Sequence, residues 1–196
     1  LVMRSGADSE MTSGLSGTDV DVIKQAPGIR RDGQAPLAAA ELVVIIDLPK
    51  IASPDAPANV PVRGIGPESI PLRSEFSIVE GRMFQFGTNE AIVGRAANRQ
   101  FSGVDLGSEF MSGNLRLRVV GTFESNGSVG ETEIWCDSHL IQGVYERGNS
   151  YQSVLAKLDS PAAFDTFKNW LTTNPQLNVQ VQRESDYYAQ QSQMMS

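Results

Sequence analysis

The residues best suited to chemistry lie in one short segment, Cys136-Asp137-Ser138-His139. A thiol or hydroxyl beside an imidazole can form a nucleophile with its base, and thiol and imidazole groups are also zinc ligands. However, the sequence has one cysteine and one histidine, and a structural zinc site needs about four ligands. His139 also lies in the first turn of a predicted helix, where a capping or surface position is ordinary. We therefore expect neither a metal site nor a catalytic group here.

Three other patterns favour structural interpretations over chemical ones. Gly64 and Gly66 resemble the start of a dinucleotide-binding fingerprint, but a proline follows and the third glycine is missing, so a turn is expected. Glu131 and Glu133 alternate on a predicted strand and need no role as a glycosidase pair. Asn126-Gly127-Ser128 matches a glycosylation triplet, yet Asn-Gly is also typical of a tight turn. The sequence thus predicts no catalytic residue, no cofactor-binding residue or cofactor, and no metal ligand.

Composition limits the classes of protein that fit. The 196 residues suffice for one domain or two small subdomains, and 40% of them are hydrophobic. The 16 Lys and Arg residues against 23 Asp and Glu residues give a net charge of −7, which argues against nucleic acid as a partner. One cysteine excludes an intrachain disulfide, and no apolar run approaches the roughly 20 residues of a membrane helix. We expect a soluble piece, either whole or excised from a membrane protein.

Hydrophobic periodicity predicts helices and strands in mixed order, without a repeat, so an α+β architecture is expected. Residues 4–17 are expected to form a loop or lead-in. The expected strands are 42–48, 60–65, 75–79, 90–93, 115–119, 131–135, 154–158 and 177–181. The expected helices begin at the cap Thr18 (with Asp21 in a box-like position), after Gly94, at the cap Asp137, at Ser160-Pro161 and at Glu184.

For two helices the sequence predicts which residues share a face. Phe164, Phe167 and Trp170 form an apolar stripe at helical spacing and are expected to face the core, not a partner. In the last helix, Tyr188, Gln191 and Met195 are expected to share one side.

A series of short motifs carries a resemblance to a known family. They are Gln25-Ala26-Pro27-Gly28-Ile29, Val62-Arg63-Gly64-Ile65 before Pro67, Val79-Glu80-Gly81-Arg82-Met83-Phe84, Glu90-Ala91-Ile92-Val93-Gly94, Leu106-Gly107, Leu117-Arg118-Val119-Val120-Gly121-Thr122-Phe123 and Ile134-Trp135. In order and spacing this series resembles the periplasmic core domain of MacB/FtsX-type ABC transporter permeases. It departs from the pattern at Cys136-Asp137, where a proline often stands.

The resemblance implies a fold and a division of the chain. The implied fold is α+β, with a mixed-sheet shell built from both chain ends and an inserted, mainly β lobe. The shell would comprise residues 15–72 and 150–196, the lobe residues 73–149, and residues 1–14 a membrane-proximal lead-in.

The resemblance also implies a function without catalysis. The domain would lie in the periplasm or another extracytoplasmic space as part of an inner (cytoplasmic) membrane permease. It would relay ATP-driven conformational change from an ATPase subunit or domain, within a permease dimer. Implied contacts are a periplasmic adaptor, a cell-wall hydrolase activator, or a lipoprotein. The alternative is a free-standing secreted binding domain without a transporter. Apolar runs directly upstream of Leu1 and downstream of Ser196 in the reading frame would favour the permease.

Overall fold

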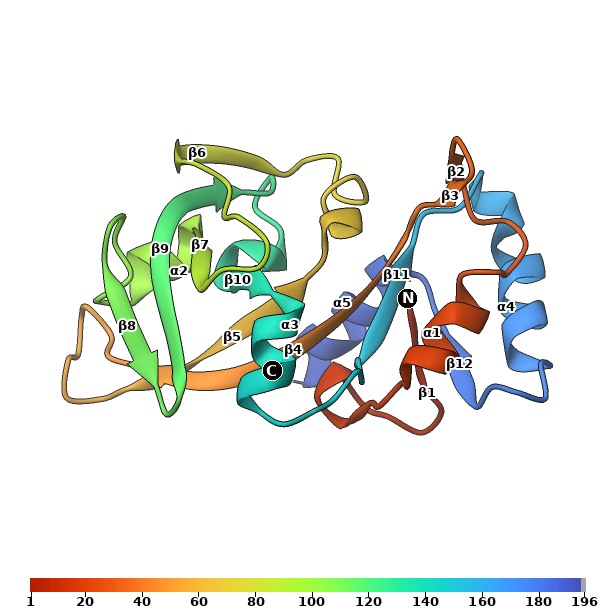
Figure 1. Ribbon diagram of the computed structural model, residues 1–196, viewed down its shortest axis with the longest axis horizontal. Coiled ribbons are helices and arrows are strands. Elements are labelled where there is room, and N and C mark those ends of the chain that lie inside the picture. The colour runs from red at the N-terminus through yellow and green to blue at the C-terminus, as the bar shows by residue number, and fades with distance from the viewer. Residues whose placement is uncertain (195–196) are drawn as a thin grey trace. The chain divides into compact units, whose positions relative to one another are not determined.

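Both ends of the chain fold into one unit, and the middle of the chain forms a second unit (Figure 1). The computed structural model describes residues 1–194. Unit 1 holds Leu1–Leu42 and the chain from Asn149 onward, and unit 2 is Val43–Gly148. The chain leaves unit 1 inside strand β4 (Ala38–Leu48) and returns after Gly148. The chain therefore enters unit 2 at Val43, whereas the sequence analysis placed the start of the inserted lobe at residue 73.

Unit 1 contains a small antiparallel sheet in the order β12-β1-β11-β4. Its strands are β1 (Val2–Arg4), β11 (Ser153–Ala156), β12 (Val179–Val181) and the first residues of β4. Val2 of β1 lies opposite Val154 on one side and Val181 on the other. The segment expected to be a lead-in therefore begins with a central strand of the sheet. Three residues are too few for hydrophobic periodicity to predict a strand.

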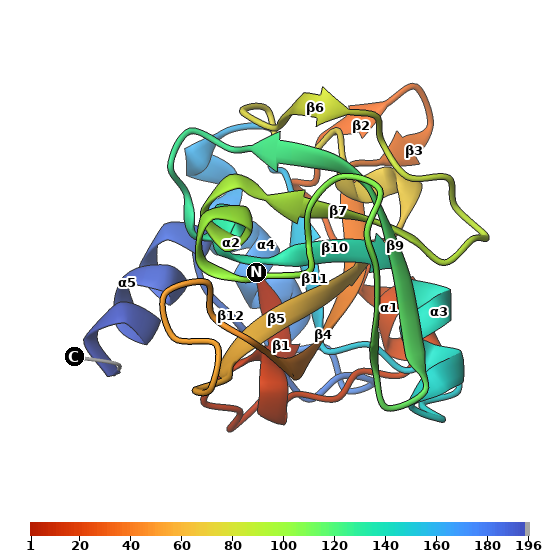
Figure 2. The same cartoon turned by 90° about the vertical axis from the view of Figure 1, so that its left-hand side faces the viewer.

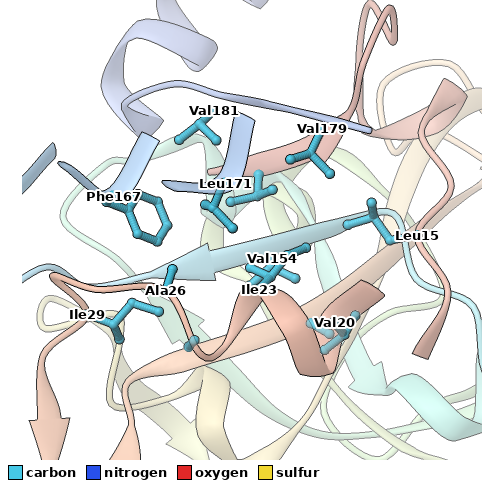
Figure 3. Packing of buried hydrophobic residues seen from close by; sticks show 13 residues of the cluster. Leu15, Val20, Ile23, Ala26, Ile29, Val154, Phe167, Leu171, Val179 and Val181 are labelled. Carbon is cyan, nitrogen blue, oxygen red and sulfur yellow. The ribbon is translucent and has the colours of Figure 1, made fainter. Parts of the chain in front are cut away.

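Helices cover one face of this sheet and enclose an aliphatic core (Figure 3). They are α1 (Gly17–Ile23) and α4 (Phe164–Thr172), the latter entered through the 3-10 turn η4 (Pro161–Ala163). Phe167 is buried among Val154, Leu171 and Val181, as predicted. Phe164 and Trp170 pack against this cluster but remain half-buried.

The start of α1 differs from the prediction. Ser16, not Thr18, is the N-cap residue: its hydroxyl accepts from the Asp19 N–H, and the Asp19 carboxylate accepts from the Ser16 N–H, both at 3.0 Å. This reciprocal capping box satisfies two N–H groups that the first turn leaves without helical partners. A short hairpin follows the helix, formed by β2 (Arg31–Asp32) and β3 (Ala35–Pro36).

Unit 2 is built on a mixed sheet. From the second part of β4 the order is β5 (Ala58–Ile65), β10 (Ile134–Asp137), β7 (Glu90–Gly94), β9 (Leu115–Glu124) and β6 (Ser77–Gly81). The pairs β10–β5 and β7–β9 are parallel, and β10–β7 and β6–β9 are antiparallel. Strand β8 (Glu109–Ser112) pairs with β9 at residues 115–118, and β6 pairs with it at residues 121–124. Figure 2 shows β6, β7, β9 and β10 of this sheet from a second side. The expected α+β fold with a mixed sheet is confirmed.

Short helices connect the strands of unit 2. They are η2 (Pro67–Ser69), α2 (Arg95–Gln100), η3 (Val129–Thr132) and α3 (Ser138–Val144). One cluster of its core is rich in aromatic rings, with the Phe123 and Trp135 ring centroids 4.1 Å apart and the Phe76 and Trp135 centroids 5.4 Å apart. No helix within residues 1–194 combines the length and the apolarity needed to cross a membrane.

Candidate functional site

The segment Cys136–His139 does not assemble a nucleophile with a base. The Cys136 side chain is fully buried, and burial raises the pKa of its thiol, which keeps it protonated. The Asp137 carboxylate accepts from the His139 N–H at 2.9 Å and from the Gly87 N–H at 2.7 Å. It therefore caps α3, as expected from the sequence, while the His139 side chain is 78% exposed. Within residues 1–194, no three Asp, Glu, His or Cys side chains gather where they could hold a metal ion.

The two glutamates 131 and 133 do not alternate on a strand, which corrects the sequence analysis. Glu131 lies in η3, and β10 begins only at Ile134. The Glu131 carboxylate accepts the backbone N–H groups of Ser125, at 2.9 Å, and Gly127. These hydrogen bonds hold the pKa of Glu131 below its usual value. Its role is to close the loop between β9 and η3.

Glu133 forms a buried ion pair that sequence reasoning missed. Its two carboxylate oxygens accept from Nε and Nη2 of Arg63 at 2.8 and 2.9 Å, and Trp135 Nε1 donates to Oε1 at 2.9 Å. Both charged residues are less than 10% exposed. The signal was present, since Arg63 lies within the apolar strand β5 and Glu133 directly precedes β10, but their pairing depends on β5 and β10 being neighbours.

The Asn-Gly motif forms a turn, as predicted, but only the second glycine of the Gly64–Gly66 motif does, because Gly64 lies within β5 and pairs with Cys136. Gly66 follows β5 and donates its N–H to the Ser69 hydroxyl at 3.2 Å, which closes the 3-10 turn η2. Asn126 and Gly127 both have positive φ, at +50° and +71°. Such consecutive left-handed conformations are those that Asn-Gly adopts in tight turns.

The most connected polar region of unit 1 joins the two chain ends, and we call it the terminal junction. Its backbone part is the pairing of β1 with β12, where the Leu1 nitrogen donates to Gln182 O at 2.8 Å and Gln182 N donates to Leu1 O at 3.0 Å. One step further, Ser5 N donates to Asn178 O at 3.0 Å. Residues separated by nearly the whole chain are thus hydrogen-bonded neighbours.

Side chains on the face opposite α1 and α4 extend the terminal junction. Because side chains alternate along a strand, Ser153 and Gln180 point away from the aliphatic core. The Ser153 hydroxyl donates to Glu10 Oε2 at 2.8 Å, and the Glu10 N–H donates to the Tyr187 hydroxyl at 3.0 Å. Glu10 belongs to η1 (Glu10–Thr12) and Tyr187 to α5 (Glu184–Met194), so both chain-end segments meet over β11.

Two glutamine side chains complete the terminal junction. Gln180 Nε2 donates to the carbonyl oxygens of Arg4 and Ala7, both at 2.9 Å. Gln191 Nε2, from α5, donates to Asp8 O at 2.8 Å. A polar cavity of about 400 Å³ opens beside them, lined by Ser5, Gly6, Ala7, Asp8, Gln180, Gln182, Gln190 and Met194.

The sequence analysis missed the residues of the terminal junction. Tyr187 is the buried tyrosine of α5, at 3% exposure, and of the three residues expected to share one side of this helix Met195 lies outside the described residues. The adjacent apolar pair Val2-Met3 was the available signal for β1, and both side chains are buried.

Unit 2 exposes apolar side chains along one edge of its sheet. Strands β8 and β6 follow one another along β9, pairing with residues 115–118 and 121–124. Met111 of β8 is 55% exposed, Val79 of β6 44%, and Leu106, which precedes β8 and lies next to Gly81, 47%. We call these three residues, which occupy successive positions along this edge, the edge residues.

The chain is similar to one protein family and to several solved structures. The model of one protein family, the MacB-like periplasmic core domain, matches residues 1–174. No curated protein matches the chain. Two solved structures are similar over nearly all of it, and because their sequence identity is below 25% they bear on the fold alone.

The first of these structures is the extracellular domain of the noncanonic ABC-type transporter YknZ from Gram-positive bacteria. It has a TM-score of 0.65 and 16% identity, covering 93% of this chain and 98% of that one. The second is the periplasmic region of MacB from Actinobacillus actinomycetemcomitans, with a TM-score of 0.63, 11% identity and coverage of 98% and 91%. A domain of a putative permease protein from Porphyromonas gingivalis is similar at a TM-score of 0.52 and 11% identity, covering 81% and 68%.

Proposed function

Because the chain belongs to the family of MacB-like periplasmic core domains, we propose that it works outside the cytoplasmic membrane as the relay domain of an ABC transporter permease. In this proposal ATP hydrolysis by a partner ATPase moves the permease, and the domain carries that movement to a periplasmic partner. A second permease copy completes the transporter. Unit 1 takes the role of the shell nearest the membrane, and unit 2 that of the inserted lobe.

The terminal junction is the observation that carries this proposal. Strand β1 pairs directly with β12, and residues 8 and 10 accept from and donate to side chains of α5. A displacement that enters through either chain end therefore reaches the same sheet. A relay requires this property, because two ends that moved independently would not give unit 1 a single response.

The edge residues of unit 2 support the contact with a periplasmic protein. Their exposed apolar side chains offer surface that an adaptor, a cell-wall hydrolase activator or a lipoprotein would cover. Photo-cross-linking in the intact transporter tests this. A cross-linker in place of Met111 is expected to capture such a protein, whereas one in place of Met11, an exposed methionine of unit 1, serves as the matched control. Equal capture at both positions would contradict a specific contact at the edge.

We propose further that the domain itself catalyses no reaction. The support is local: the Cys136 thiol is buried, and the Asp137 carboxylate already accepts two backbone N–H groups. Cys136→Ala is expected to leave transport and ATP hydrolysis by the intact transporter unchanged. If a folded Cys136→Ala variant lost a catalytic activity that the parent domain shows, the domain would be an enzyme and the proposal would be wrong.

A disulfide across the terminal junction tests the relay. Val2 and Val181 lie opposite each other next to the doubly hydrogen-bonded pair Leu1–Gln182, so they form a non-hydrogen-bonded pair. Such pairs have Cα atoms about 4.5 Å apart, within the range that a disulfide spans. The full-length permease with Val2→Cys and Val181→Cys is expected to transport equally well oxidised and reduced. If oxidation stopped transport and reduction restored it, the two ends would have to separate, and the proposal would fail.

A second experiment weakens the terminal junction at another contact, the hydrogen bond between Glu10 and Tyr187. Tyr187→Phe keeps the ring but removes the hydroxyl that accepts from Glu10. We expect less transport per ATP hydrolysed, with Tyr188→Phe as the neighbouring control. Equal coupling in both variants would show that this hydrogen bond has no part in the relay.

A further inference from the structure

The exposed turn between β9 and η3 contains the only Asn-Gly pair in the sequence. Glycine carries no side chain to hinder its own nitrogen, so in this dipeptide the Gly nitrogen can approach the Asn side-chain carbonyl more closely than in any other. Asn126 and Gly127 are both exposed. The chemistry that follows from such a pair is loss of the side-chain amide, one of the reactions that make Asn thermolabile.

The nitrogen that would react is held by a hydrogen bond. Gly127 N–H donates to Oε2 of Glu131, and the same oxygen accepts the Ser125 N–H at 2.9 Å. Glu131 is itself 7% exposed, so this carboxylate is a fixed part of the loop. Turning the Gly127 nitrogen onto the Asn126 side chain requires rotation of the peptide between them, which withdraws the N–H from the carboxylate.

We infer that Asn126 is a site of spontaneous deamidation, and that the Glu131 carboxylate slows the reaction in the folded domain. In the reaction the Gly127 nitrogen loses its proton and bonds to Asn126 Cγ, and ammonia leaves. Water then opens the resulting succinimide ring at either carbonyl, which gives aspartate or isoaspartate. The balance is one amide and one water converted to one carboxylic acid and one ammonia, so solvent is the only co-reactant.

The product changes the loop in two ways. A new negative charge appears at residue 126, between the two residues whose N–H groups bind the Glu131 carboxylate, and like charges at short range repel. Isoaspartate also adds one carbon to the main chain inside the loop that Glu131 closes, so the two N–H groups no longer reach one oxygen together. Modification therefore loosens the connection between β9 and η3.

Peptide mapping by mass spectrometry after incubation at mildly alkaline pH tests the inference. The whole domain is incubated folded and in urea, and the mass increase from amide to acid is followed at Asn126. Asn149, an exposed asparagine followed by the small residue Ser150, is the internal control in the same samples. In urea we expect Asn126 to react faster than Asn149. In the folded domain we expect Asn126 to slow by about ten- to a hundredfold, the worth of one hydrogen bond to a charged acceptor.

Two variants separate the role of Glu131 from general unfolding. Glu131→Ala, shown to be folded by its Trp135 emission, is expected to recover most of the rate seen in urea, while Asn149 keeps its folded rate. Glu131→Gln retains an acceptor oxygen and is expected to lie between. Absence of reaction at Asn126 in urea would overturn the site. Equal folded and unfolded rates, or a folded Glu131→Ala variant as slow as the parent, would overturn the role of Glu131.

Discussion

The core of unit 1 is mainly aliphatic and comes from both ends of the chain, whereas unit 2 comes from one continuous stretch and holds a cluster of aromatic rings within its core. In unit 1, Val2 and Val181 meet across neighbouring strands. In unit 2, Phe76, Phe123 and Trp135 stack within residues 43–148, above a buried ion pair. Unit 2 therefore has all the residues for its own sheet before the chain ends, while unit 1 cannot close until β12 is available.

The difference can be followed experimentally, because each unit holds one of the two tryptophans. Trp170 reports on unit 1 and Trp135 on unit 2. The variants Trp135→Phe and Trp170→Phe isolate each signal in the whole domain.

Removal of β1 should produce the largest difference in stability between the two units. Deleting residues 1–5 takes away the central strand of unit 1 and leaves β11 and β12 without a common neighbour. We expect unit 1 to lose its cooperative unfolding transition while unit 2 retains its own, as measured by the two tryptophan signals in urea. Loss of both transitions together would mean that unit 2 depends on unit 1 for its fold.

Truncation of the unit 1 core should be nearly as damaging. Phe167→Ala removes a ring that is 2% exposed, and such substitutions cost about 3–5 kcal/mol of unfolding free energy. Phe164→Ala, at the half-buried edge of the same helix face, is the matched control and should cost less. Equal losses of unfolding free energy, measured by chemical denaturation, would contradict this difference. Two large losses would mean that both rings are buried, and two small losses that both are exposed.

Breaking the ion pair should weaken unit 2 selectively. Glu133→Ala leaves Arg63 charged and buried, and removing one partner of such a pair costs about 3–5 kcal/mol. The double variant Arg63→Met with Glu133→Leu should recover part of this loss, since apolar replacements of a buried pair are often neutral or better. If the double variant were the less stable of the two, the charges would contribute more than their desolvation costs.

Acid should produce the smallest effect, and again in unit 2. The Arg82 guanidinium, followed by the Gln85 N–H, lowers the pKa of Glu90 from 4.5 to about 2. A carboxyl with a lowered pKa stabilises the fold above its unfolded pKa, and this contribution is lost as the pH falls from about 4.5 through about 2. Because Arg82 is largely exposed, solvent screens the pair and the change should be the smallest of the four. Glu90→Gln should show a flatter stability curve for Trp135 across this interval.

Elements with a long apolar pattern could be predicted from the sequence. The strands β5, β7 and β9 and the stripe of α4 were found because each contains a local run or spacing of apolar residues typical of its element. Strand β1 was missed because three residues cannot establish one, and its place is set by β11 and β12 from the far end of the chain.

Polar contacts were the least predictable part. The capping box at Ser16 is local, and the predicted cap, Thr18, was wrong by only two residues. The Arg63–Glu133 pair and the contact of Glu10 with Tyr187 join residues far apart in the chain, and both depend on which strands are neighbours. Sequence patterns give the faces of elements, but not the partners across them.

The pairing of β1 with β12 has a mechanical consequence. The strands are antiparallel, so Leu1 and Gln182, to which the two chain ends attach, lie at the same end of the ladder. Opposed forces on these points would open the ladder like a zipper, one hydrogen-bonded pair at a time, instead of shearing all pairs together. A common pull would load no pair at all. The sheet is therefore stiff toward joint motion of its ends and weak toward their separation, and the hydrogen bonds of α5 to residues 8 and 10 reinforce that weak direction.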